Sequence, residues 1–580
     1  MIYLFFGIIY AGWLIPNHYF PWLAGWSDAT SIIGLILLTI YSLHKKLFQI
    51  NISILLFIFF GLIFSIPWVQ LLTNHIHFLG DAVMVSLYAA LGLLACILGK
   101  SLANNPKLST QGLTALSTAC ATAAILSTGV ALAQWTGAVS LGIYGADLPT
   151  GERPFGNVAQ ANHFNTLCFL GICALFFLYE QLKIEKLGFF AGTIFLLIGM
   201  ILAQSRTGWL QVGFLIIWGF IQHLRMRNRI EKNWLILFGG LFSLGIFSLN
   251  SINKLLLLDP GRALSDQVAP GARPAYWFSM LDALNLQPWW GYGWQQIGAA
   301  QQNIAIDHPP SPIYFEHSHN LVLDLMLWNG IPIGLLLTTL LVLWLYRQIR
   351  SYTQPHTGWL LVGLMGLGIH GLLEFPLEYA YFLIPAGLLM GFIEGSTSQA
   401  SIRVIAIPRK IFACGIVAVV TVSSMVASEW LAAEANYRTL RFESARIGQQ
   451  EASSSPPDLL LLTQLNAFLT FARTEATPAM SPEQVEWMRQ VAARFGYPPV
   501  MFRYALAAGL SGKNREAEVT LQRICHIHGR ERCTEAQEGW EILQQRFPQL
   551  QQISGPSHAQ LINSWPPAIP PTSPPASPAP

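Results

Sequence analysis

The stretch Glu316-His317-Ser318-His319-Asn320 joins a long hydrophilic segment to an apolar run that begins at Leu321. The run over 319–345 is long enough to cross a lipid bilayer, which takes about 20 apolar residues of helix. The short polar stretch therefore marks the point where a loop meets a predicted membrane helix. The hydrophilic segment before this stretch and the apolar run after it are the two kinds of segment from which the rest of the chain is built.

The composition of the 580-residue chain is that of a protein with many membrane helices. Hydrophobic residues make up 53% and charged residues 11%, and the mean hydropathy is +0.45, which lies outside the range of ordinary soluble domains. The formal net charge of +3 is too small to indicate a nucleic-acid partner. We therefore predict an all-α polytopic membrane protein that contacts membrane lipid and binds no nucleic acid.

Apolar segments of suitable length recur along the chain and predict about thirteen transmembrane helices. The predicted spans are 2–15, 30–43, 52–69, 80–99, 113–135, 163–180, 187–204, 207–222, 233–250, 319–345, 357–373, 378–394 and 411–427.

The distribution of lysine and arginine predicts the orientation of these helices. Short cytoplasmic loops accumulate basic residues, and alternate loops do so here, at 45–46, 100–107, 183–186, 225–232, 347–350 and 403–410. The intervening loops hold few basic residues. This pattern places the 251–318 loop, the stretch around His319 and all residues after Ala427 outside the cytoplasm.

The chain divides into five predicted parts. They are membrane helices over 1–250, one large loop over 251–318, membrane helices over 319–427, a soluble helical domain over 428–564 and a Pro-, Ser- and Ala-rich tail over 565–580. A loop of this length is usually functional. Within the helical domain, the pattern over 504–517 suggests paired helices of the tetratricopeptide (TPR) type, and the tail is expected to be disordered.

Two arginine-containing segments lie at predicted outer ends of membrane helices. The segment 151–163 contains Arg153, Asn157 and Asn162, which could hold an anionic or sugar-like group at a helix N-terminus. A capped surface loop is the structural alternative. Arg206 lies between two apolar runs with almost no connecting loop, and its guanidinium suits a diphosphate, although a snorkelling arginine is the alternative.

The long loop contributes a second candidate cation. Arg273 lies four residues before Trp277, and an aromatic cluster follows at 288–294. These rings could stack on sugar faces, or they could form an interfacial aromatic belt.

The opening stretch contains the candidate for proton transfer. His319 directly precedes the apolar run and His317 lies two residues earlier. A neutral imidazole can accept a proton from a hydroxyl group, and Glu316 and Asn320 are neighbours that could bind substrate or orient the ring. An incidental histidine at the membrane interface is the structural alternative.

Several short motifs, taken in order, resemble one family. They are Arg153-Pro154-Phe155-Gly156-Asn157, Ser205-Arg206-Thr207-Gly208, Arg273 with Trp277 and Gly291-Tyr292-Gly293, and His319-Asn320 followed by Gly330. Together they look like the O-antigen ligase and polymerase superfamily. The run 370–379, which includes Glu374, and the soluble C-terminal domain make the chain most similar to bacterial protein O-oligosaccharyltransferases of the pilin-glycosylation (PglL/PilO) type.

The resemblance implies an enzyme of the bacterial inner membrane with its active-site loop and C-terminal domain in the periplasm. It would transfer a glycan from an undecaprenyl-diphosphate-linked oligosaccharide to Ser or Thr of a periplasmic acceptor protein, such as a pilin or a Ser/Ala/Pro-rich segment. His319 would act as the base, and Arg206 and Arg273 would bind the diphosphate. Glu374 would position the acceptor or lock helices together.

The sequence predicts no metal ion and no cofactor for this reaction. The aspartates of the long loop, Asp259, Asp266, Asp282 and Asp307, are scattered rather than paired, so we expect arginine to supply the counter-charge. A lipopolysaccharide O-antigen ligase or polymerase is the nearest alternative function. A transporter of lipid-linked glycans is the alternative from another class, but it would place charges along a path near the bilayer midplane.

Two cysteines lie in polar sequence, and we predict a disulfide between them. Cys525 and Cys533 belong to the same soluble domain, in a compartment expected to be oxidising. A metal site with His526 and His528 is the alternative. The tail carries Thr572, Ser573 and Ser577, which are candidates for modification by the enzyme itself.

Overall fold

The computed structural model describes residues 1–45, 50–106, 108–149, 151–258, 273–311, 313–397, 403–445 and 455–556. The predicted tail over 565–580, with Thr572, Ser573 and Ser577, lies outside these ranges, as do Asp259 and Asp266. The chain forms two compact units, each built from three segments. Unit 1 consists of Met1–Phe64, Leu87–Ala269 and Thr339–Ser424, and unit 2 of Ser65–Ser86, Pro270–Thr338 and Met425–Pro580.

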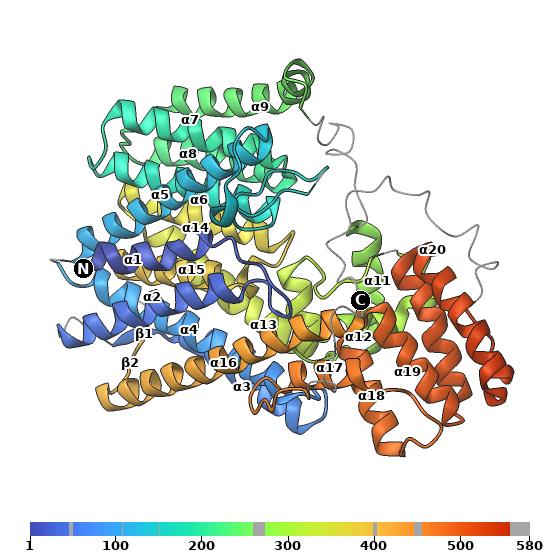
Figure 1. The fold of residues 1–580 in the computed structure, drawn as a ribbon. Helices are drawn as coiled ribbons and strands as arrows, with labels where there is room; N and C mark the ends of the chain where they lie inside the picture. Colours follow the sequence, from blue (N-terminus) through green and yellow to red (C-terminus); the bar gives the residue numbers. More distant parts are fainter. Residues whose placement is uncertain are drawn as a thin grey trace. The chain divides into compact units, whose positions relative to one another are not determined.

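Helices make up nearly all of the regular structure, as predicted (Figure 1). Those that lie wholly or partly in unit 1 are α1 (Ile2–Ala11), α2 (Gly25–His44), α3 (Ile54–Leu72), α4 (Leu79–Ala103), α5 (Ser109–Thr136), α6 (Ala161–Glu180), α7 (Lys186–Ala203), α8 (Arg206–Arg225), α9 (Lys232–Leu255), α13 (Leu321–Ser351), α14 (Pro355–Gly371), α15 (Ala380–Ser396) and α16 (Arg409–Ser444). Short 3-10 turns, η1 (Gly12–Leu14), η2 (Gly142–Tyr144) and η4 (Pro376–Glu378), lie between them.

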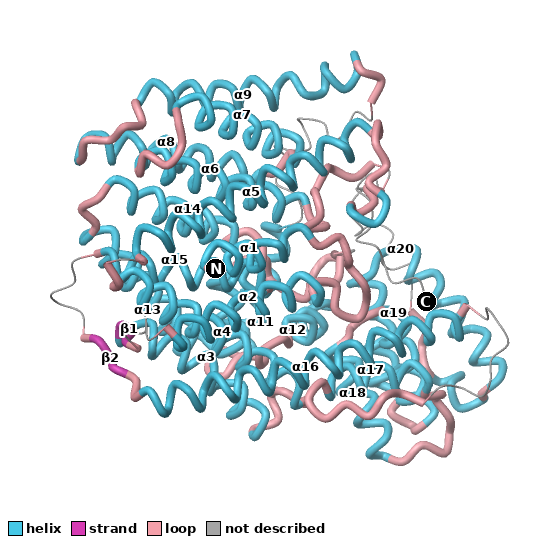
Figure 2. Tube along the Cα trace, turned by 60° about the vertical axis from the view of Figure 1, so that its left-hand side comes forward, coloured by secondary structure: helices cyan, strands magenta, loops and turns pink. Residues whose placement is uncertain are grey.

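Each of the thirteen predicted spans falls on one of these helices. Within the described residues, nine helices are long and apolar enough to cross a membrane, and Ile2–Leu14 and Ala380–Ser396 are shorter apolar helices. The protein is therefore a multi-helix membrane protein, and the count of thirteen spans stays a prediction. Helix α6 is buried along nearly its whole length, and beyond its first two turns its side chains are almost all apolar. Helices α5, α7 and α14 pack around it (Figure 2).

One small sheet departs from the all-α expectation. Strand β1 (Asn51–Ser53) pairs antiparallel with β2 (Val404–Ala406), and Ile52 lies opposite Ile405. Each strand directly precedes the first turn of a predicted membrane helix. The pairing requires both connecting segments to lie on the same side of unit 1, in agreement with the charge pattern that assigned both to one side.

A buried ion pair links several elements of unit 1. Lys100 Nζ lies 2.7 Å from Glu394 Oε1, and both side chains are almost completely buried. Trp344 Nε1 donates to the other carboxylate oxygen, and the Ser53 amide donates to Oε1. A charge in an apolar interior is costly unless it is paired and hydrogen-bonded, and these contacts satisfy that requirement while tying α4, α13, α15 and β1 together.

Unit 2 combines the predicted loop with the C-terminal region. Its own helices are α11 (Arg273–Leu286), α12 (Ile297–Ile304), α17 (Thr463–Arg473), α18 (Pro482–Arg494), α19 (Pro498–Leu510) and α20 (Asn514–Arg546), with 3-10 turns η3 (Ala305–Asp307) and η5 (Pro548–Gln552). The core is formed by apolar side chains of α17 to α20, among them Phe471, Met488, Val491, Met501, Leu521, Ile524 and Trp540. Helix α18 starts with a capping box, in which the Ser481 side chain accepts from the Gln484 amide.

The C-terminal region is helical, as predicted, with α19 and α20 packed as a pair. Its assignment as a tetratricopeptide fold stays a prediction. The predicted boundary between 427 and 428 falls inside α16, which continues without interruption to Ser444. Helix α20 changes direction at Gly529, whose φ is +85°.

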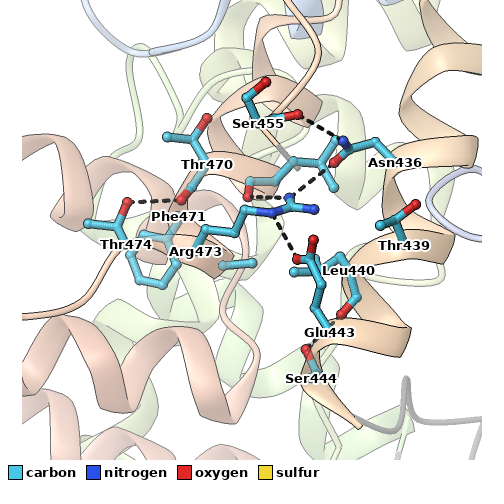
Figure 3. A network of polar contacts seen from close by, with 12 residues as sticks. Asn436, Thr439, Leu440, Glu443, Ser444, Ser455, Thr470, Phe471, Arg473 and Thr474 are labelled. Atoms are coloured by element: carbon cyan, nitrogen blue, oxygen red, sulfur yellow. Dashed lines mark hydrogen bonds and ion pairs between the residues drawn. The ribbon is translucent and has the colours of Figure 1, made fainter. Parts of the chain in front are cut away.

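Arg473, the last residue of α17, forms hydrogen bonds with the C-terminal part of α16 inside unit 2 (Figure 3). Its Nε donates to Glu443 at 3.0 Å, and its Nη1 donates to Asn436 Oδ1 at 3.0 Å and to the Leu469 carbonyl at 3.2 Å. Asn436 in turn donates to the Ser455 carbonyl. One guanidinium thus joins two helices through charge-assisted hydrogen bonds.

Candidate active site

His319 has an unusual backbone conformation at the start of α13. Its φ is +56°, in the left-handed region that non-glycine residues seldom occupy. Asn320 follows as the N-cap, since its Oδ1 accepts the amides of Val322 at 3.1 Å and Leu323 at 3.2 Å. The chain therefore turns sharply at His319 and enters the helix at the next residue.

Helix α11 holds the residues on either side of this turn. Trp277 Nε1 donates to the Ser318 carbonyl at 2.8 Å, and the rings of Tyr276 and Phe315 lie 3.9 Å apart. Arg273 precedes these two aromatic residues by three and four positions, so it lies on the same face of α11. The structure thus brings Arg273 to the side of α11 that faces the His319 turn.

Asp324 organises the turn from inside α13. This carboxylate is 2% exposed, accepts the Ser318 amide at 2.7 Å and lies 4.0 Å from His317 Nδ1. The sequence reasoning missed Asp324, although an acidic residue within a predicted membrane helix is a signal of function.

The two histidines differ in their surroundings. His317 is buried, close to Asp324 and to the edge of the Trp328 ring. His319 is half-buried and contacts the edge of the Phe315 ring. The imidazole of His319 is therefore the more accessible of the two, and the role of each histidine at the site stays a prediction.

Glu316 and Asn320, predicted to bind substrate, both make contacts within the protein. Asn320 uses its side-chain oxygen to cap α13, and Glu316 accepts a hydrogen bond of 2.7 Å from the Tyr497 hydroxyl. Both side chains therefore help to shape the loop, and their role in binding substrate stays a prediction.

The C-terminal region supports the loop that leads to His319. The Ser311 amide donates to the His526 carbonyl at 2.8 Å, and the Gly496 amide donates to the Tyr314 hydroxyl at 3.1 Å. His528 Nε2 lies 2.7 Å from the Gly496 carbonyl, and burial lowers the pKa of His528 to about 4. This ring is therefore neutral and donates a hydrogen bond near neutral pH.

Cys525 and Cys533 are joined by a disulfide on either side of the Gly529 kink. His526 and His528 lie within the closed loop and contact backbone carbonyls of His308 and Gly496. Among the described residues, no group of three or more His, Cys, Asp or Glu side chains could hold a metal ion.

The glycines of the motif around 291 and 330 allow close backbone packing. The Tyr292 amide donates to the Leu327 carbonyl, and the Ile331 amide to the Pro288 carbonyl, each at 2.7 Å. Gly330 has φ +78° and interrupts α13, and a Cβ there would lie 2.2 Å from the Trp289 carbonyl oxygen. Only glycine permits this approach, which fixes the segment before α12 against α13.

Arg206 lies in unit 1, at the first residue of α8. It follows Gln204, which has φ +46°, and Ser205, whose hydroxyl donates to Asn162 Oδ1 at 2.8 Å. Asn162 Nδ2 donates to Glu374 Oε1 at 2.8 Å. The structure therefore joins Asn162 and the buried Glu374 in one network that holds the residue directly before Arg206.

Arg153 and Asn157 also lie in unit 1, where they bind backbone groups. Arg153 Nη1 donates to the carbonyls of Ala203 and Gln204 at the end of α7. Asn157 is 3% exposed, and its amide donates to the carbonyls of Leu14 and Tyr144 while its oxygen accepts the Ala146 amide. Both amide hydrogens of Asn157 are thus used within the protein, so this side chain has a structural role, and its part in substrate binding stays a prediction.

Unit 1 also contains a buried histidine pair that the sequence reasoning did not assign to the site. The rings of His163 and His370 lie 5.3 Å apart, and His163 Nδ1 lies 3.3 Å from the Tyr381 hydroxyl. His370 occurs four residues before Glu374. Histidine within a predicted membrane helix was the available signal.

The fold and the matches to known families define a multi-pass membrane glycosyltransferase. Residues 191–339 match the family model described as O-Antigen ligase, and residues 356–542 match the one described as Virulence factor membrane-bound polymerase, C-terminal. The chain is 25% identical to the General O-oligosaccharyltransferase of Acinetobacter baylyi over 536 residues, which cover 90% of each chain. It is 31% identical to the ComP-specific O-oligosaccharyltransferase of the same organism over 252 residues, 43% of this chain and 45% of the relative. The expected resemblance to O-oligosaccharyltransferases is thus confirmed.

Proposed function

We propose that the protein transfers a glycan from an undecaprenyl-diphosphate-linked donor to Ser or Thr of a periplasmic acceptor protein, with type IV pilin among the candidates. The similarity to a general O-oligosaccharyltransferase over 90% of both chains carries the proposal. The large loop and the C-terminal domain would lie in the periplasm, and the membrane would be the bacterial inner membrane.

The proposed reaction is a single displacement at the anomeric carbon. His319 accepts the proton of the acceptor hydroxyl, the hydroxyl oxygen forms a bond to the anomeric carbon, and the bond from that carbon to the phosphate oxygen breaks. The electron pair of that bond leaves with the lipid diphosphate. The anomeric configuration is inverted, and no covalent enzyme intermediate or metal ion is needed.

The two arginines act on the leaving group in this proposal. Arg206 is half-buried at a helix N-terminus, where backbone amides and the helix dipole also favour an anion. Arg273 lies on the face of α11 that also holds the His319 turn. Guanidinium groups that are already in place stabilise the negative charge that develops on the diphosphate.

The test is co-expression with a defined lipid-linked glycan and an acceptor protein, followed by intact-mass analysis of the acceptor. His319→Asn is the sharpest variant, since asparagine tolerates a left-handed backbone but cannot act as a base, and His319→Ala provides a second form. We expect transfer to fall by a factor of about 10² or more, while His317→Asn, checked for folding, retains more activity. Full transfer by both His319 variants would refute the assigned base.

A second candidate function is a lipopolysaccharide O-antigen ligase or polymerase, which the two family-model matches favour. The same cells discriminate the candidates when they contain both a protein acceptor and a lipid A-core acceptor. Glycan found only on lipid, or joined only to further lipid-linked glycan, would support this second candidate.

A further inference from the structure

Unit 2 contains a cavity of about 780 Å³ whose wall is strongly basic. Cationic side chains come from α18 and from the first three turns of α20 with the residue before them, and Glu516 is the one acidic residue among the lining residues described. The four cations of the wall are Arg489, Lys513, Arg515 and Arg523. The charge of the wall therefore favours an anionic ligand.

The beginning of α20 adds to this positive potential. The lining residues Gly512–Glu516 surround the N-terminus of this 33-residue helix, where unpaired backbone amides and the helix dipole attract anions. The N-terminus thus reinforces a cluster of cationic side chains that is already present.

Not all of these cations are neutralised within the protein. Arg489 forms two hydrogen bonds with Glu486, at 2.8 and 2.7 Å, and Lys513 lies 3.7 Å from Glu516. Arg523 Nε is buried and has no hydrogen-bond partner among the described residues. A buried guanidinium nitrogen with no partner is costly, and a carboxylate in the cavity would satisfy it.

Helix α12 connects the cavity to the loop that carries His319. Gln301 Nε2 donates to the Ile313 carbonyl, and Gln301 Oε1 accepts the Phe315 amide. The next residue, Gln302, lines the cavity and donates to the carbonyls of Ala492 and Ala493. The cavity and the loop before His319 therefore contact neighbouring residues of one helix, on adjacent faces.

We propose that this cavity binds an acidic segment of the acceptor polypeptide, at a distance from the hydroxyl group that is glycosylated. The inference rests on the proposed function and names a specificity site for it. Gln302 and Asn303 in the wall carry carboxamides, which both donate and accept hydrogen bonds and so match peptide groups. Because the cavity and the loop before His319 contact different residues of α12, the acidic residues of the acceptor would lie several residues from the modified Ser or Thr.

Peptide binding to the purified full-length protein tests the proposal directly. The probes are fluorescent Ser/Ala/Pro-rich peptides with two aspartates four to six residues from the serine, and matched peptides with asparagine in their place. We expect the aspartate peptide to bind about tenfold more tightly, equivalent to two partly enclosed ion pairs. In Lys513→Gln/Arg515→Gln, the affinity for the aspartate peptide should fall to that of the asparagine peptide.

The matched control is Arg438→Gln/Arg441→Gln, which removes two exposed positive charges of α16 that do not line the cavity. It should bind the aspartate peptide as the wild type does. Equal binding of both peptides to the wild type, or equal losses in the cavity and control variants, would overturn the proposal. Competition by a free hexuronic acid oligosaccharide, with no preference between the peptides, would assign the cavity to an acidic glycan and overturn it as well.

The experiment separates failure of this inference from failure of the proposed function. His319→Asn should bind the aspartate peptide normally but transfer glycan to it at a rate lower by a factor of about 10² or more. If the wild type glycosylates aspartate and asparagine peptides equally well at all concentrations, the cavity proposal fails while the proposed function stands. If it glycosylates no protein acceptor but binds the aspartate peptide selectively, the proposed function fails.

Discussion

His319 holds a left-handed backbone that costs roughly 1–2 kcal/mol for a residue with a side chain. The contacts of Ser318 with Trp277 and Asp324, and the cap that Asn320 places on α13, offset this cost. The imidazole is thereby presented at a fixed point between a packed loop and a helix. Fixed geometry of this kind is what a proton acceptor in a displacement reaction requires.

The position of Asp324 leads to a prediction about orientation. Asp324→Ala should lower the transfer rate roughly 10- to 100-fold, because the Ser318 amide loses its acceptor and the His319 turn loosens. Asp324→Asn should recover much of the rate, since its oxygen can still accept that amide. Initial rates with purified protein and donor measure both, and equal rates for the alanine variant and the wild type would contradict the role.

His528 gives a prediction about pH. Burial lowers its pKa to about 4 in the folded protein, compared with about 6.5 in an unfolded chain, so the unfolded state binds the extra proton between these values. Stability is therefore lost as the pH falls through 6.5 towards 4, by about 2 kcal/mol between pH 7.5 and pH 5. Burial also lowers the pKa of His526. Protonation of His526 in the unfolded chain therefore lowers the stability further as the pH falls.

Thermal unfolding of the full chain in detergent at the two pH values measures this loss. His528→Gln keeps an amide donor for the Gly496 carbonyl and should show a smaller pH dependence than the wild type. An unchanged dependence in that variant would rule out His528 as its source.

Helix α13 is divided at Gly330, and the division is needed for the segment 288–293 to dock on it. The sequence placed this helix correctly and recognised Gly291, Gly293 and Gly330 as motif residues. The sequence alone could not show why glycine is needed at these positions. The reason is a close backbone contact between two segments that lie about 40 residues apart in the chain. The β1–β2 pair was missed for a related reason, since three-residue strands leave no periodic pattern.

Gly330→Ala should destabilise unit 2 by about 3 kcal/mol, through positive φ and a clash of the new methyl group with the Trp289 carbonyl. Gly240→Ala is the matched control: this glycine lies within α9, and a Cβ there has no atom within 4 Å. It should leave stability unchanged or raise it by up to about 1 kcal/mol. Thermal unfolding of both variants gives the comparison, and similar melting temperatures would contradict the close approach at Gly330.

For the whole molecule, the sequence predicted the class of fold and most of the candidate site residues. Helix positions follow from local hydrophobicity, so every predicted span coincides with a helix. Contacts between distant segments do not follow from it. Asp324 and the histidines at 163 and 370 carried a signal, as titratable residues in predicted membrane helices. Their partners, and the hydrogen bond of Asn162 with Glu374, follow only from the packing of the helices.

The Lys100–Glu394 pair gives a prediction for unit 1 as a whole. Lys100→Met leaves a buried carboxylate without its counter-charge, so we expect a loss of about 3–5 kcal/mol. The double variant Lys100→Met/Glu394→Gln removes both charges and keeps one acceptor oxygen for either Trp344 or the Ser53 amide. It should therefore be more stable than the single variant. Melting temperatures of the variants in detergent measure these changes in stability. A double variant that is less stable than Lys100→Met would contradict the assigned role of the ion pair.

The loop before His319 is held by residues that are made much later during synthesis. Tyr497, His526 and His528 follow His319 by roughly 200 residues, which corresponds to about 10–40 s at typical ribosome speeds of ~5–20 residues per second. Until those residues emerge and fold, the loop lacks the partners that support it. A nascent chain therefore carries the proposed catalytic histidine well before its loop is supported. We expect a truncated translation product that ends before α19 to be inactive.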